Sequence, residues 1–293
     1  MEQASREKGK LMAEMLRRCS TALLACVMCC FGAAAQSAQP SNNIMFKTLM
    51  IKSKTEAGTM FSIEVDNREY WLTAKHILTG RKSGPVGEVI EKTVSLDALV
   101  PIGEAIKWES IQFAVIDPGK DIDIVVLAPT IKFLDIGIPS LKVSSGTFGM
   151  GEECSFLGFP FANTWTATFS NSTRYKMPFI KHCYISGIIR SPTAILVLDG
   201  INNPGFSGGP VLYHTGLDQV VLGVISGYHN EPGEVHSIEV PDVPTAAQAP
   251  DNKKPTKKKD VVDLNTGIIL AFMADVAVDA IKKNPIGRLV EAK

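Results

Sequence analysis

The sequence lacks several features that would point at once to a class of function. Its 30 basic and 30 acidic side chains cancel to a formal net charge of zero. It therefore has neither the basic excess typical of nucleic-acid binding nor the acidic excess of a solvating or cation-binding surface. The five histidines are scattered, and no C-x-x-C pair occurs after residue 35. We therefore expect no zinc site, and nothing in the sequence calls for another metal or an organic cofactor.

The bulk composition is that of an ordinary soluble globular protein. The chain has 293 residues, of which 45% are hydrophobic and 20% charged. This length suits one large domain or two small ones and supplies enough apolar material for a core.

Residues 1–35 have the pattern of a secretory signal peptide. Arg17 and Arg18 precede an apolar run, Cys19–Ala35, which ends in three small residues. A basic segment, an apolar segment and a small-x-small end are typical of a cleaved signal, which predicts a periplasmic or secreted protein. Two alternatives remain open: a retained membrane anchor, since the run is at the short limit for a span, or a lipoprotein signal at Cys26.

Only two cysteines lie beyond this segment. An isolated pair in an exported chain makes Cys154 and Cys183 a candidate disulfide. Two buried free thiols are the equal alternative.

After a flexible tail at 36–43, the chain shows many short segments rich in β-branched and aromatic residues, with turn residues between them. No alternation of strands and helices accompanies them, so the pattern predicts an all-β barrel or sandwich fold. The expected strands are Met45–Ile51, Met60–Val65, Tyr70–Leu72, Ile111–Val115, Ile124–Leu127, Cys154–Leu157, Tyr184–Ile189, Ala194–Leu198, Pro210–Tyr213, Val220–Ile225 and Gly267–Phe272.

Two further segments do not show this pattern of short strands. Residues 273–283 show helical periodicity, and two lysines followed by Pro285 are typical of a helix end. Residues 237–263 combine prolines with a lysine cluster and predict a disordered surface insertion between two strands.

The stretch Pro204–Pro210 (PGFSGGP) matches the G-x-S-x-G pattern around a nucleophilic serine, Ser207. The same pattern describes the nucleophile elbow of α/β-hydrolases, in which a helix follows the serine. Here Pro210 and the apolar residues after it indicate a strand. The elbow also requires a histidine late in the chain, whereas the most distinctive one, His76, comes long before the serine.

His76 follows an apolar segment that reads as a buried strand, which suits a base held in a fixed position. Two aspartates, Asp121 and Asp123, precede another apolar strand, Ile124–Leu127. On an extended chain both would point to the same face. The order His76, Asp123, Ser207 is that of chymotrypsin-like double barrels.

With these motifs the sequence resembles the trypsin-like serine proteases, in particular bacterial trypsin-like peptidases. The resemblance covers about residues 45 to 285, and its serine and histidine motifs are the specific ones. The matching segments are Gly58–Thr59, Thr73–His76, Asp123–Leu127, Gly158–Pro160 and Gly205–Pro210.

The resemblance implies one protease domain at 44–285, with two six-stranded antiparallel β-barrels at about 44–140 and 145–272 and a C-terminal helix at about 273–283. It implies an exported serine endopeptidase with a polypeptide substrate. Ser207 would be the nucleophile, His76 the base and Asp123 its orienting acid, preferred over Asp121 because the DIVVL segment matches the family. The N–H groups of Gly205 and Ser207 would form the oxyanion hole.

The chain departs from the family at Phe206, where an Asp or Asn usually precedes the serine. Phe206 cannot pair with a freed N-terminus, and no activation site is present, so we expect no cleavage-activated zymogen. Phe206 is either an apolar anchor for the loop or the mark of a degenerate site. If the family spacing holds, the first specificity pocket has Ile201 at its base. Its walls would come from a single strand and comprise Ser226, Gly227 and Tyr228.

A second function of another class remains open, namely a catalytically inactive trypsin-like module that binds peptides or protein partners. The sequence carries no indication of an oligomeric state.

Overall fold

The computed structural model describes residues 42–54, 56–80, 87–134, 136–144, 147–168, 173–190, 193–215, 218–237 and 258–290. The predicted signal peptide, nearly all of the predicted tail and most of the predicted insertion lie outside these residues. Within the described ranges, Asn42 and Asn43 of the predicted tail belong to a short helix, α2. Ser237 and residues 258–263 of the predicted insertion belong to strands.

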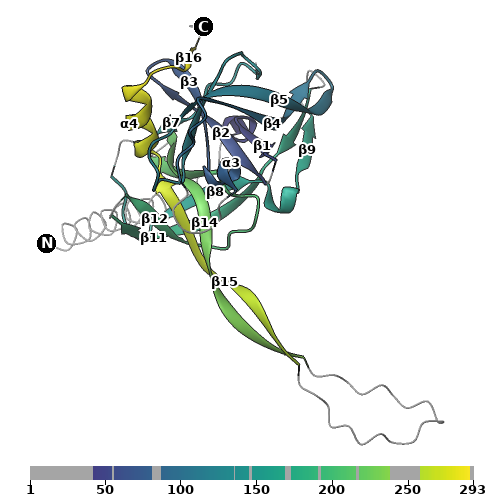
Figure 1. Ribbon diagram of the computed structural model, residues 1–293, viewed down its shortest axis with the longest axis vertical. Coiled ribbons are helices and arrows are strands. Elements are labelled where there is room, and N and C mark those ends of the chain that lie inside the picture. Colours follow the sequence, from purple (N-terminus) through teal and green to yellow (C-terminus); the bar gives the residue numbers. More distant parts are fainter. Residues whose placement is uncertain are drawn as a thin grey trace, which may run out of the picture. The chain divides into compact units, whose positions relative to one another are not determined.

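Two closed antiparallel β-barrels of six strands each form the body of the protein (Figure 1). The first follows the order β3-β2-β1-β4-β5-β6 and is closed by pairing of β3 with β6, with Trp71 opposite Leu127. Its strands are β1 (Thr48–Lys52), β2 (Ala57–Val65), β3 (Arg68–Thr73), β4 (Thr93–Ile102), β5 (Ala105–Ile116) and β6 (Val125–Pro129).

The second barrel follows the order β13-β8-β11-β12-β15-β14 and is closed by pairing of β13 with β14. Closure satisfies the strand edges that an open sheet would leave unpaired. Its strands are β8 (Glu153–Gly158), β11 (Phe179–Ile189), β12 (Ile195–Asp199), β13 (Pro210–Thr215), β14 (Asp218–Ser237) and β15 (Lys258–Met273). Two closed six-stranded barrels are the chymotrypsin-like fold that the sequence predicts.

Shorter elements complete the described chain. They are α2 (Asn42–Phe46), α3 (His76–Thr79), β7 (Lys142–Val143), the 3-10 turn η1 (Pro160–Ala162), the hairpin β9 (Trp165–Thr168) and β10 (Arg174–Met177), α4 (Asp275–Lys283) and β16 (Arg288–Leu289). Among the described residues no helix is both long and apolar enough to cross a membrane.

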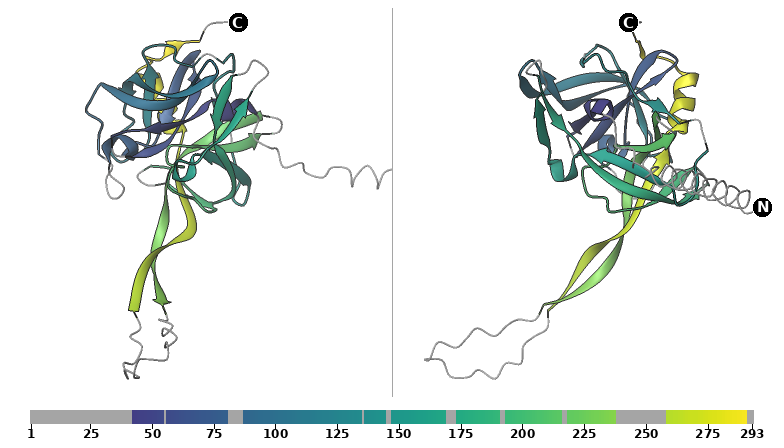
Figure 2. Two further views of the ribbon diagram at one scale, coloured as in Figure 1. Left: turned by 90° about the vertical axis from the view of Figure 1, so that its right-hand side faces the viewer. Right: turned by 180° about the vertical axis from the view of Figure 1, so that it is seen from behind.

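Each barrel encloses a core, and a third cluster joins the two. Trp71 and Phe113 fill the first barrel, and Phe156 and Leu198 the second. The third cluster contains residues of both barrels together with Ala277 and Ile281 of α4, the yellow helix in Figure 2. The two barrels and the C-terminal helix therefore share one apolar interior.

The structure differs from the predicted strands in several places: β4 and the short strands β7, β9, β10 and β16 were not predicted, and β5 and β11 begin before their predicted starts. Two further differences have a clear structural basis. The predicted strand Met45–Ile51 begins as helix, because the Lys47 amide and the Thr48 hydroxyl both bond to the Ile44 carbonyl and close a helical turn. This segment is buried in either conformation, so its apolar pattern could not distinguish them.

Strands β14 and β15 are the second difference, since both run well past their predicted ends. They pair with each other from Asn230–Asn265 to Ser237–Lys258 (Figures 1 and 2). Backbone hydrogen bonds between the two strands hold this extension together. The polar composition of the segment did not predict this pairing.

A buried ion pair ties the start of the first barrel to β3. The Lys47 ammonium lies 3.0 Å from the Glu69 carboxylate, and both side chains are over nine-tenths buried. Glu69 also accepts a hydrogen bond from Ser140 and lies 3.8 Å from the guanidinium of Arg288.

We predict that Lys47→Met lowers the free energy of unfolding by about 3 kcal/mol, because it leaves the Glu69 carboxylate buried without its nearest cation. Urea denaturation measures this change. Lys52→Met is the matched control: the Lys52–Asp97 pair is roughly four-tenths exposed, so its loss should cost about 1 kcal/mol or less. Equal losses in the two variants would contradict the argument.

Candidate functional site

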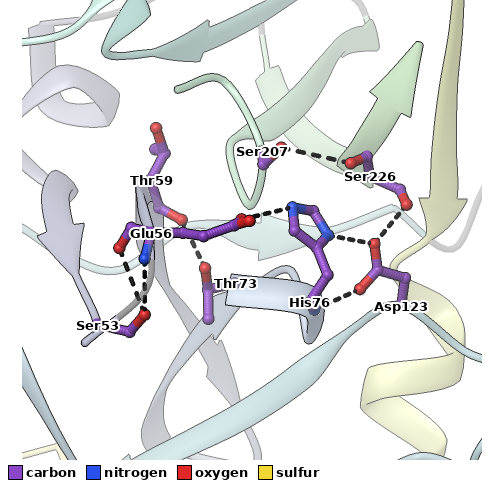
Figure 3. A network of polar contacts seen from close by, with 8 residues as sticks. All are labelled: Ser53, Glu56, Thr59, Thr73, His76, Asp123, Ser207 and Ser226. Atoms are coloured by element: carbon purple, nitrogen blue, oxygen red, sulfur yellow. Dashed lines mark hydrogen bonds and ion pairs between the residues drawn. The ribbon is translucent and has the colours of Figure 1, made fainter. Parts of the chain in front are cut away.

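His76 is placed at the junction between β3 and α3 (Figure 3). The buried strand that carries Trp71 and Leu72 ends at Thr73, whose hydroxyl bonds to the Thr59 carbonyl at 2.7 Å. The chain then turns into the short helix that starts at His76. The imidazole is nine-tenths buried and is therefore held by the first barrel.

The carboxylate of Asp123 fixes the orientation of this ring. One oxygen accepts the His76 backbone N–H at 2.8 Å, and the other lies 2.7 Å from His76 Nδ1. Because a carboxylate only accepts hydrogen bonds, Nδ1 carries a proton and donates it. In the neutral ring Nε2 is then an acceptor, as a general base requires.

Asp123 and Asp121 have different surroundings. Asp123 is 2% exposed and accepts a third hydrogen bond, from the Ser226 hydroxyl at 2.5 Å. Asp121 is exposed. Of the two aspartates, between which the sequence favoured Asp123, only Asp123 bonds to His76 in the part of the chain that the structure describes.

A buried lysine braces the loop that carries Asp123. Lys75, the residue before His76, is completely buried, and its ammonium bonds to the Asp117 carboxylate at 2.6 Å and the Gly119 carbonyl at 2.5 Å. It thereby joins the histidine segment to the loop before β6. Nothing in the sequence indicated this role beyond the unusual position of a lysine next to an apolar strand.

Glycines give the Ser207 loop its shape. Gly205 has a φ of +102°, and a Cβ there would lie 2.1 Å from the Phe159 carbonyl oxygen. At Gly208, with a φ of +83°, a Cβ would lie 2.1 Å from the Thr59 carbonyl oxygen. Neither position admits a side chain.

The loop is also bonded across the two barrels. The Thr59 amide donates to the Ser207 carbonyl at 2.9 Å, and the Thr59 hydroxyl donates to the Gly205 carbonyl at 2.8 Å. Within the described residues, the amides of Gly205 and Ser207 have no hydrogen-bond acceptor. Two neighbouring amides without a partner are what an oxyanion hole requires.

The Ser207 hydroxyl points to the Ser226 carbonyl oxygen, at 3.4 Å (Figure 3). No hydrogen bond joins it to His76 in the described part of the chain. The Nε2 edge of His76 instead faces the carboxylate of Glu56, at 3.9 Å. In enzymes with catalytic triads, such hydrogen bonds are often long or poorly aligned until substrate binds.

The four residues predicted to form the specificity pocket differ in their hydrogen bonds and in their exposure to solvent. Ser226 bonds to Asp123 through its hydroxyl, a role that the sequence did not indicate. The carbonyl of Gly227 accepts a hydrogen bond from Asn202, and Tyr228 is partly buried in β14. Ile201 is 62% exposed.

Phe206 is fully buried and anchors the loop. Its ring meets Phe156 edge-to-face with centroids 4.9 Å apart, and a Cβ at Gly158 would lie 2.6 Å from it. Of the two interpretations of Phe206, this packing matches the apolar anchor. The aromatic ring fills the second-barrel core where the resembling family usually has Asp or Asn.

Lys181 supports the same loop from β11. Its ammonium donates to the Ile201 carbonyl at 2.7 Å and to the Asn203 side chain at 2.6 Å, and it lies 5.3 Å from the Phe206 ring centroid. Partial burial lowers the pKa of Lys181. Sequence reasoning missed this residue, because only pairing of β11 with its neighbours brings it to the loop.

Cys154 and Cys183 face each other across β8 and β11 as buried free thiols, with their sulfur atoms 2.9 Å apart. The predicted disulfide is thus not formed in the structure, although the two residues that it would join are in contact. The hydrogen bond to Cys154, followed by burial, raises the pKa of the Cys183 thiol. Such a thiol stays protonated and is a poor nucleophile.

The comparisons with known proteins show similarity of fold only. No protein-family model and no curated protein matches the chain. Among solved structures, the Rv3671c protease of M. tuberculosis in its inactive form is 15% identical at a TM-score of 0.45, with 82% of this chain and 89% of that chain covered.

Two more solved structures are similar to the same degree. The HtrA-type protease AlgW with a tripeptide is 15% identical at a TM-score of 0.48, with 83% of this chain and 63% of that chain covered. Human heparin binding protein is 12% identical at a TM-score of 0.47, with 85% and 97% covered. At these values the likeness carries no argument about activity, and the assignment of the fold rests on the strand order.

We predict that Phe206→Ala lowers the free energy of unfolding by about 3–5 kcal/mol, because it removes a fully buried ring from the second core. Thermal or urea unfolding measures the loss. Phe161→Ala is the matched control, since Phe161 lies near the same loop but is 64% exposed, and should change stability by about 0.5 kcal/mol or less. If Phe206→Ala were as mild as its control, Phe206 would not anchor the loop.

Proposed function

We propose that this protein, which has the chymotrypsin-like fold of the trypsin-like serine proteases, is an exported serine endopeptidase. Its substrate would be a polypeptide, cleaved through His76, Asp123 and Ser207. Export is supported by the signal-like pattern at residues 1–35.

One observation supports this function above the others, namely the buried contact between His76 Nδ1 and Asp123. It selects the tautomer in which Nε2 can accept a proton, and it would stabilise the imidazolium that forms during the reaction. A histidine that served only the core would not need a buried carboxylate bonded to both its ring and its backbone.

In the proposed mechanism, Ser207 Oγ attacks the carbonyl carbon of the scissile bond. A serine hydroxyl is a poor nucleophile on its own, so His76 Nε2 takes its proton as the new bond forms. His76 then gives this proton to the leaving amine as the carbon–nitrogen bond breaks, which leaves an acyl group on Ser207. Water, deprotonated by the same nitrogen, then attacks this ester and releases the second product, and the proton returns to Ser207. The Ser207 side chain has to turn from the Ser226 carbonyl toward His76 before the attack.

The amides of Gly205 and Ser207 would bind the oxyanion of the tetrahedral intermediate. Each such donor contributes about 3 kcal/mol to transition-state stabilisation. Support comes from the absence of acceptors for both amides in the described chain and from the bonds that hold the loop to Thr59. Phe206 and Lys181 would order this loop, in place of the ion pair with a freed N-terminus.

A non-catalytic peptide-binding module is the second candidate. It is favoured by the hydroxyl of Ser207, which bonds to Ser226, and by the carboxylate of Glu56, which faces His76 Nε2. Reactivity of Ser207 separates the two functions.

We predict that a fluorophosphonate probe labels the mature protein at Ser207, because such probes react with serines that an adjacent base activates. Labelling should vanish in Ser207→Ala and His76→Ala. It should persist in Ser95→Ala, which alters an exposed serine on β4. With a peptide substrate, Ser207→Ala should lower kcat about a millionfold, and adding His76→Ala should cost little more.

Labelling is read by mass spectrometry of the modified peptide, with circular dichroism to verify that each variant is folded. A folded wild-type protein that takes up no probe would overturn the enzyme function and leave the non-catalytic module.

We further predict that Asp123→Asn lowers kcat by about 10⁴-fold, because an amide at this place favours the wrong imidazole tautomer. Asp121→Asn is the matched control and should keep nearly full activity, since Asp121 is exposed. Steady-state kinetics of both variants measure the two changes in kcat. The assignment is wrong if the change at Asp121 is the damaging one.

A further inference from the structure

The environment of His76 contains a second carboxylate that the proposed triad does not use. Glu56 Oε2 lies 3.9 Å from His76 Nε2, on the edge of the ring away from Asp123 (Figure 3). The Glu56 side chain is only 14% exposed, and the His76 ring only 9%. The imidazole thus lies between two carboxylates, one at each nitrogen.

Glu56 is held in this place by its own backbone. Its amide donates to the Ser53 hydroxyl at 3.1 Å, and its carbonyl accepts from the Ser53 amide at 2.8 Å. Three residues on, Thr59 is bonded to the Ser207 loop. The residue that carries the carboxylate is therefore fixed on one side by a tight turn and on the other by the nucleophile segment.

The following step rests on the proposed function. Nε2 takes the proton of Ser207 and passes it to the leaving amine, so the leaving group has to approach this edge of the ring. Glu56 borders the same edge. We propose that Glu56 is a specificity-determining residue that selects a lysine or arginine directly after the scissile bond.

The negative charge of Glu56 is the physical reason for this preference. A partly buried carboxylate attracts a cation more strongly than an exposed one, because water screens it less. A substrate cation at this position gains an ion pair with Glu56. Substrates without the cation do not gain this interaction.

The experiment compares peptides that differ only in the residue after the scissile bond. Fluorophosphonate labelling of Ser207 first shows whether the site is reactive. A mixture of proteome-derived peptides, analysed by mass spectrometry, then identifies a cleaved sequence. From it, quenched fluorescent peptides are made with lysine, arginine, glutamine, leucine or glutamate after the cleaved bond.

We expect the wild-type protein to cleave the lysine and arginine peptides with a kcat/KM about tenfold above that for glutamine. Glu56→Gln should abolish this ratio, and Glu56→Lys should reverse it in favour of glutamate. Glu64→Gln is the matched control, a glutamate near the far end of β2, the strand that begins directly after Glu56, and should retain the wild-type ratio.

The outcomes separate the two proposals. If wild-type Ser207 is not labelled, the protease function fails and the specificity proposal fails with it. If Ser207 is labelled and peptides are cleaved, but the ratio is one in the wild-type protein, the protease function stands and Glu56 has no such role. A Glu56→Gln variant that changes all peptides by the same factor also overturns the proposal, since that result marks a residue that only tunes His76.

Discussion

The candidate site depends on one buried carboxylate, that of Asp123. A charge so far from water is stable only while donors surround it. It receives the His76 amide, the His76 ring and the Ser226 hydroxyl. These donors come from the β3–α3 junction and from β14 of the second barrel. The same side chain therefore orients the His76 ring and links the two barrels on which the candidate site is built.

The loop of Ser207 meets a different constraint, which is steric. Gly205 and Gly208 approach carbonyl oxygens so closely that no Cβ fits. In the same loop, the amides of Gly205 and Ser207 have no acceptor in the described chain. The buried ring of Phe206 also fixes the position of the loop by packing on Phe156. In the family that the sequence resembles, an aspartate at this position can form an ion pair with a freed N-terminus. Here apolar packing of Phe206 holds the loop instead.

Much of this arrangement could be predicted from local patterns. The short strands, the C-terminal helix and the serine and histidine segments each have a signature within a few residues. Glu56, Lys75 and Lys181 have none, because their partners lie far along the chain and the contacts arise only when the barrels close. The helix α2 was missed for another reason, since an apolar segment is buried equally well as helix or strand.

The sequence by itself indicated an all-β barrel or sandwich fold and singled out a candidate histidine and a candidate serine, because strand patterns and glycine spacing are local properties of the chain. The sequence favoured Asp123 over Asp121 only through a family resemblance, and only the tertiary structure shows that Asp123 contacts His76 and that Glu56 lies at the opposite edge of the ring. Both contacts join segments that are well separated along the chain. Such contacts follow from strand pairing and core packing, which no single stretch of sequence encodes.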